Sequence, residues 1–178
     1  WTRLRDAAVA TDDRAEVEEA ARQAIAIMPD SRFAWLVPLE YPLAYGRNDE
    51  ARAALENIKT HGPKSLDFTQ TLLPWALGDE VVEPGRLSRA IAEAPPSAAS
   101  PYIVARRDVA RYNEYLEQAG AIPQGYYFAN LYRSKPAGQE MLRDPRVKAK
   151  LVDYGFVAYW REKGWPAGCR PLGDSDFE

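Results

Sequence analysis

The residue types that most often do chemistry are scarce in this chain. Its 178 residues include one cysteine and one histidine. Cys169 has no second cysteine to pair with or to activate it, and His61 alone cannot supply the ligands of a zinc site. His61 precedes Gly62-Pro63, a pattern typical of the solvent-facing end of a helix. From these two residues we expect no metal site, no cofactor and no catalytic nucleophile.

Two other groups of side chains could form a site with chemistry of its own. Glu40 and Tyr41 could face a cavity together with Asp67, because paired acids in different environments can divide acid and base roles. Such a carboxylate-based enzyme should have a closed pocket and carboxylates whose pKa values are strongly shifted. A small-ligand sensor would instead enclose an aromatic pocket, here walled by Tyr126, Tyr127, Phe128 and Tyr132. Both remain alternatives to the function favoured below.

Composition narrows the class of protein. Hydrophobic residues make up 46% and charged residues 28% of the chain, with a net charge of −3, which is typical of a folded globular chain. Positive charges are scattered among acids, so we expect no contact with nucleic acid. No apolar run approaches the roughly 20 residues that span a bilayer. The start at Trp1, without a signal-peptide pattern, indicates a piece of a longer protein, periplasmic if a transmembrane helix lies upstream and otherwise cytoplasmic.

Helix start and stop signals predict an all-α fold. Asp13 and Glu16 form a capping-box pattern before an apolar stripe that ends at Pro29. Pro95-Pro96-Ser97 is the best internal boundary, so we expect one part over residues 1–96 and a second over 97–178. The tail from Trp165 is too rich in glycine and proline to be regular. The expected helices after the first cover residues 33–45, 49–60, 65–77, 81–94, 101–119, 126–133, 145–154 and 156–163.

One repeat unit can be read between Pro29 and Pro63, which lie 34 residues apart. A large aromatic residue, Trp35, comes early in its first helix, and the small Ala51 lies where the two helices should cross. This spacing resembles the tetratricopeptide repeat (TPR), which implies a right-handed superhelix of helical hairpins. Helix 13–28 would be the second half of an earlier repeat. Residues 65–95 would be a worn later one, with Glu83 at the small crossing position.

The first helix of the central repeat departs from the TPR pattern. It contains Pro38 and Pro42, each of which removes a backbone donor and should kink or break it. In such a stack the first helices line a concave groove, and an exposed apolar strip rimmed by acids would suit a peptide. The alternative is that the apolar members, Phe33, Leu36 and Leu43, are core. The candidate groove residues are Phe33, Leu36, Glu40 and Leu43, followed by Asp67, Gln70 and Pro74.

The C-terminal segment carries a distinctive pattern, Asp144-Pro145-Arg146 followed by Tyr159-Trp160-Arg161, Gly164-Trp165-Pro166 and Cys169-Arg170-Pro171. It resembles the ending of bacterial multidomain signalling proteins, in which a winged-helix or an adenylate/guanylate cyclase domain precedes a TPR-like region. Val147 and Phe156 depart from that pattern. The resemblance implies a regulatory or protein-interaction region.

The aromatic side chains of this ending predict a helical cap that covers the last face of the repeat stack. The expected cap residues are Leu151, Phe156, Tyr159, Trp160 and Trp165. The alternative is an aromatic cage for a ligand, formed by Tyr159, Trp160 and Trp165. Taken together, the sequence favours a non-catalytic protein-interaction or sensory scaffold that binds a protein or peptide partner.

Overall fold

The computed structural model describes residues 13–95, 98–118, 131, 135–166, 169–173 and 176–177. Most of these residues are helical, which confirms the all-α prediction, whereas the TPR assignment stays a prediction. The helices are α2 (Arg14–Ile27), α3 (Arg32–Ala44), α4 (Asn48–His61), the 3-10 helix η1 (Lys64–Leu66), α5 (Thr69–Leu77), α6 (Pro84–Glu93), α7 (Ser100–Arg106), α8 (Val109–Gln118), α10 (Ala137–Leu142), α11 (Pro145–Asp153) and α12 (Phe156–Lys163).

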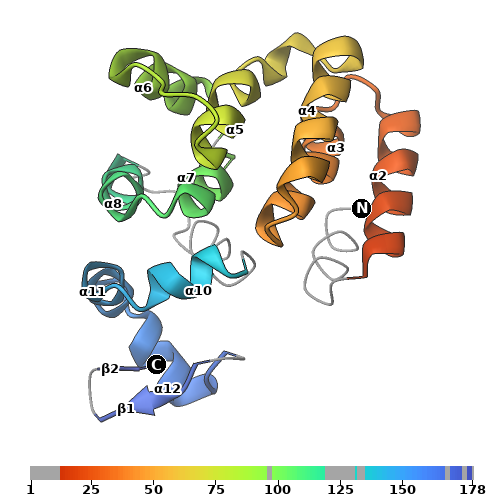
Figure 1. Ribbon diagram of the computed structural model, residues 1–178. Helices are drawn as coiled ribbons and strands as arrows, with labels where there is room; N and C mark the ends of the chain where they lie inside the picture. The colour runs from red at the N-terminus through yellow and green to blue at the C-terminus, as the bar shows by residue number, and fades with distance from the viewer. Residues whose placement is uncertain are drawn as a thin grey trace.

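Consecutive helices pack against each other as hairpins. The pairs α3/α4, α5/α6, α7/α8 and α11/α12 are in contact, and α7 also contacts α3, α5 and α10. In Figure 1 the chain runs from α2–α4 on the right, over α5 and α6 at the top, to α10–α12 at the bottom. One main core extends from Trp35 in α3 to Phe177, so the two parts indicated by the sequence share it. A smaller core joins α2 to α3 through Val17, Ala21, Val37 and Tyr41.

Local signals fix several helix starts. Asp13 accepts the Glu16 backbone N–H at 3.0 Å, and Asp144 accepts that of Arg146 at 2.8 Å. Glu83 does the same for Gly85 and Arg86, both at 2.8 Å. We expected Glu83 inside a helix at a crossing position, and this prediction is wrong. Pro84 has no N–H to donate, so it begins α6 at the first position and leaves Glu83 as the N-cap.

Helix α3 stays continuous through its two prolines. Each missing donor costs about 3 kcal/mol in a helix interior. The loss is offset by burial, because α3 packs against α2, α4 and α7 and most of its side chains are inaccessible. After the second proline, the Pro42 carbonyl accepts the N–H groups of Tyr45, at 3.2 Å, and Arg47, at 2.8 Å. Of the two outcomes that the prolines left open, a kink or a break, the break does not occur.

The helix that we expected over residues 101–119 is broken. Arg107 adopts the left-handed region with φ 60° and ends α7, and α8 begins at Val109. The N–H groups of Arg107 and Asp108 return to the carbonyls of Val104, at 2.9 Å, and Ile103, at 3.2 Å. On both sides of the break the apolar side chains still face the interior, since Val104, Val109, Tyr112 and Leu116 are buried and Tyr115 packs on the core.

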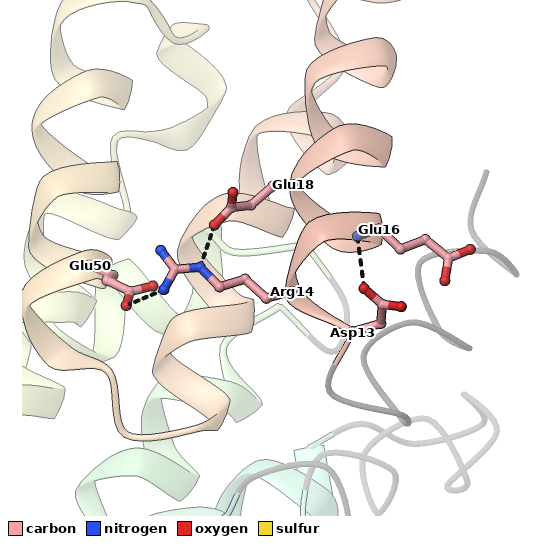
Figure 2. Close-up of polar contacts among 5 residues, drawn as sticks. All are labelled: Asp13, Arg14, Glu16, Glu18 and Glu50. Carbon is pink, nitrogen blue, oxygen red and sulfur yellow. Dashed lines mark hydrogen bonds and ion pairs between the residues drawn. The ribbon is translucent and has the colours of Figure 1, made fainter.

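Ion pairs link helices that are distant in sequence. Figure 2 shows Arg14, at the start of α2, between Glu18 of the same helix and Glu50 of α4, the latter at 3.2 Å. Arg52 of α4 makes two bonds, of 2.8 and 2.7 Å, to Asp79 after α5. Similar pairs join Arg107 to Glu140 of α10 and Lys150 of α11 to Glu117 of α8. These pairs are exposed, so each contributes modestly to stability.

The C-terminal part contains more regular structure than the sequence indicated. Helices α11 and α12 match expectation, whereas α10 was not expected. Residues β1 (Pro171–Leu172) and β2 (Asp176–Phe177) pair antiparallel, so the tail is not wholly irregular. The helix expected over 126–133 lies outside the described residues apart from Leu131, which is helical and buried. Within the described part of the chain, no helix is long and apolar enough to cross a membrane.

Candidate functional site

Two of the candidate groove residues are part of the protein core. Leu36 is 3% exposed and Leu43 is 5% exposed, and both belong to the main core. Their placement on an open groove is therefore a misassignment. The reason is that α3 contacts helices on several sides, so its apolar residues are covered whichever face they occupy. The alternative interpretation of these two leucines as core describes them correctly.

Phe33 differs from the two leucines because its ring is 55% exposed. It lies in the first turn of α3, before the buried residues of this helix begin at Ala34. The guanidinium of Arg32 lies over the ring at 5.3 Å from its centroid. Such a contact is worth about 0.5–1 kcal/mol at an exposed site.

Two further large apolar side chains are exposed immediately before α3. Ile27, the last residue of α2, is 63% exposed, and Met28 is 42% exposed. Together with Phe33 they are three exposed apolar side chains within seven residues of the chain, a segment that we call the α2–α3 patch. Isolated exposed apolar residues are ordinary, but several in one short segment mark a candidate interaction surface.

The connection that carries the α2–α3 patch is held in place by specific bonds. The indole Nε1 of Trp35 donates to the Pro29 carbonyl at 2.7 Å. The N–H of Ser31 donates to the Met28 carbonyl at 3.0 Å, and the N–H of Met28 donates to the Ala24 carbonyl at 2.9 Å. Because Trp35 is itself 7% exposed and packed in the main core, the turn is anchored to the interior. The patch is therefore presented on a fixed backbone.

Glu40 is the acidic candidate on α3, and it is half-buried. Its charge acts on the phenol of Tyr102 in α7, a fully buried side chain. Burial first, and then the negative charge of Glu40, raise the pKa of Tyr102 well above its usual range. Among the residues that the structure describes, no group forms a hydrogen bond with the Tyr102 hydroxyl. Glu40 lies on α3 and Tyr102 on α7, two helices that are in contact.

The candidates from the second unit lie around the start of α5. Asp67 is exposed and accepts a hydrogen bond from the Gln70 amide at 3.2 Å. Pro74 is half-buried within α5, and its carbonyl accepts the Asp79 N–H at 2.9 Å. Asp67 and Gln70 are thus surface groups that bond to each other.

The residues of the carboxylate-enzyme alternative point to different neighbours. Tyr41 packs in the smaller core with Val17 of α2, and its ring meets that of Tyr45 at 5.3 Å. Glu40 acts instead on Tyr102 of α7. Adjacent residues on a helix are rotated by roughly 100°, which explains why these two diverge. For the small-ligand alternative, the aromatic residues 126–128 and 132 lie outside the described residues.

The residues with metal-binding or nucleophilic chemistry are separate from each other. His61 is exposed and ends α4, as its sequence context predicts. Cys169 is half-buried against the core, and burial raises the pKa of its thiol, which lowers the thiolate fraction. In the parts of the chain that the structure describes, no three His, Cys, Asp or Glu side chains gather in a way that could hold a metal ion.

Four of the five expected cap residues contribute to the main core: Leu151 and Trp160 are buried in it, and Phe156 and Trp165 pack against it. Trp160 and Trp165 lie 5.7 Å apart between ring centroids, but Tyr159 is 60% exposed and takes no part in the core. The third ring is that of Phe177, which is 1% exposed and meets Trp160 at 5.6 Å. Sequence reasoning missed Phe177 because a single phenylalanine in an acidic tail has no periodic neighbours. Its apolar ring among acidic residues was the one available signal.

Comparisons with protein-family models, with curated proteins and with solved structures found no match to this chain. Any assignment of function depends on the geometry described above.

Proposed function

We propose that this chain is a non-catalytic helical scaffold that binds a protein or peptide partner, as the C-terminal regulatory part of a larger bacterial signalling protein. The α2–α3 patch is the contact surface in this proposal. The C-terminal pattern that resembles signalling proteins, and the 34-residue spacing that resembles a TPR, motivate the regulatory setting.

The observation that carries the proposal is the contrast along the segment from Ile27 to Phe33. Most apolar side chains of α3 are buried, yet Ile27, Met28 and Phe33 are 42–63% exposed. These three residues flank a turn that is bonded to the core through Trp35. Exposing apolar surface costs free energy in water, at about 25 cal/mol per Å². That free energy is recovered when a partner covers the exposed apolar surface.

The distribution of acidic and nucleophilic groups also favours binding over catalysis. Tyr41 packs against α2, whereas the charge of Glu40 raises the pKa of Tyr102 in α7, and Asp67 accepts a hydrogen bond from Gln70. Catalytic acid–base pairs need side chains within hydrogen-bond reach of one reacting group. The patch needs no such convergence, because apolar contact is non-directional.

The test places a photo-crosslinking phenylalanine analogue at position 33 of the full chain, with position 159 as the matched control, since Tyr159 is 60% exposed on α12. Crosslinking is carried out in extract of the cells from which the chain comes. We expect a discrete adduct from position 33 and none of the same mass from position 159. The double substitution Ile27→Ser with Met28→Ser should abolish the adduct while the melting temperature stays unchanged, because surface substitutions usually alter stability by about 0.5 kcal/mol or less.

Two results would contradict the proposal. One is that position 159 gives the same adduct as position 33, which would indicate nonspecific capture. The other is that the adduct survives the double substitution, which would remove the α2–α3 patch from the contact.

A further inference from the structure

Phe177, in the C-terminal tail (residues 171–178), packs its side chain against α11, α12 and Trp165, which follows α12. Besides its contact with Trp160, the Phe177 ring lies 6.1 Å from the Trp165 ring, between centroids. The ammonium group of Lys148 lies 5.1 Å from the centroid of the same ring. We call Lys148, Trp160 and Trp165 the Phe177 site.

Lys148 recognises two features of Phe177 at once. Its ammonium group lies over the ring and also donates a hydrogen bond to the Phe177 carbonyl oxygen. Arg161 of α12 donates in the same way to the Gly173 carbonyl at 2.6 Å. Any extended peptide with a phenylalanine presents an aromatic ring and main-chain carbonyls. The same contacts can therefore bind phenylalanine-containing peptides other than the tail.

The described residues of the tail form little regular structure. Its two strands are two residues long, and a hairpin of this size has little stability of its own. Among tail residues whose side chains the structure describes, only Phe177 is buried, whereas Pro171, Leu172 and Gly173 are exposed. In the described part of the tail, the ring of Phe177 and the carbonyls of Gly173 and Phe177 are points of attachment to α11 and α12.

Charge favours the same kind of ligand. The tail contains three acidic residues and no basic residue, which gives −3. Residues 143–166, which include α11 and α12, contain six basic and three acidic residues, which gives +3. Opposite net charges on the two segments promote their association and oppose binding of basic peptides.

We propose that the Phe177 site is a recognition site for an acidic, phenylalanine-bearing segment of a partner protein, and that the chain's own tail occupies it in cis. The partner segment competes with the tail for this site because both present the same ring, carbonyl and charge. The tail has the advantage of a high effective concentration, so the site binds partners only when the tail is loosened. This site is separate from the α2–α3 patch, and its failure would leave the proposed function untouched.

The test uses the full chain and a fluorescein-labelled peptide with the sequence of residues 171–178, followed by fluorescence anisotropy. In the variant Phe177→Ala the tail no longer fills the site. We expect this variant to bind the peptide at least about tenfold more tightly than the wild-type chain. A peptide with alanine in place of the phenylalanine should lose binding, and raised salt should weaken it. Adding Lys148→Met to the Phe177→Ala chain should lower the affinity by about tenfold.

A second variant loosens the tail without removing any residue of the site, in case Phe177→Ala fails to fold. Gly173 has φ 63°, and a Cβ added there meets no atom within 4 Å. Valine is therefore strained at this position by its backbone alone. Gly173→Val should raise peptide affinity, whereas the matched substitution Gly46→Val, at φ 69° between α3 and α4, should not.

Three outcomes would overturn the proposal. The first is that neither Phe177→Ala nor Gly173→Val binds the peptide more tightly than the wild type does. The second is equal binding of the phenylalanine and alanine peptides. The third is a concentration-dependent wild-type dimer that the peptide dissociates, which would assign the site to the tail of a second copy.

Discussion

The substitution Trp35→Ala tests the central part of this structure most directly. The indole is 7% exposed, lies in the main core and donates to the Pro29 carbonyl at 2.7 Å. Removing a buried tryptophan side chain costs about 3–5 kcal/mol. The hydrogen bond should supply only about 1 kcal/mol of this, because Pro29 is exposed and water can replace the indole. We therefore expect a total near the middle of that range, most of it from packing.

Urea denaturation followed by far-UV circular dichroism measures this loss as a shift in midpoint at unchanged slope. Trp35→Phe separates the two contributions, because it keeps a large ring and removes the donor, and it should cost roughly 1–2 kcal/mol. Tyr159→Ala is the control for an exposed aromatic residue, with an expected loss of about 0.5 kcal/mol. A loss below about 1 kcal/mol for Trp35→Ala would refute the core position, and with it the repeat alignment built on that residue.

Three further predictions concern single groups. Tyr102→Phe removes a buried hydroxyl that has no hydrogen-bond partner in the described structure, so the free energy of unfolding should stay within about 1 kcal/mol or rise; a larger loss in urea denaturation would point to a bonded hydroxyl. Arg107→Val should be less stable than Arg107→Gly by roughly 1–2 kcal/mol, because valine is strained at φ 60°; equal midpoints would contradict that backbone argument. Hydrogen bonds from Arg52 lower the pKa of Asp79 in the folded state. The pair's contribution to the free energy of unfolding is therefore fully present above the unfolded-state pKa of about 4, and it is lost as the pH falls through the lower pKa of the folded state. Asp79→Asn should therefore lose less melting temperature on acidification than wild type, and an identical pH profile would exclude the pair.

Helix ends were predictable where the signal is local. Pro29 follows the end of α2, and Asp144-Pro145 begins α11, because a cap and a proline act within one turn of the helix. The break at Arg107 has no such signal, since neither glycine nor proline stands there. Its guanidinium pairs with Glu140, 33 residues further along the chain, and only the folded chain brings the two together.

The residues of the candidate site also fall into two groups, those that the sequence places correctly and those that only the fold places. The exposure of Phe33 agrees with its predicted place on a groove. The sequence could not show that Leu36 and Leu43 are buried instead, because α3 is apolar almost all round and its periodicity therefore selects no face. The repeat spacing between Pro29 and Pro63 says nothing about Ile27 and Met28, which precede it.

The sequence by itself determined that the chain is helical and where many of its helices begin and end, because caps, prolines and apolar stripes act over a few residues. The tertiary structure alone decided which side chains stay at the surface, since burial depends on the neighbours that pack against each face. Phe33 and Leu36 lie on one helix and differ in whether another helix covers them. Phe177 lies in an acidic tail and is buried because Lys148, Trp160 and Trp165 meet it there.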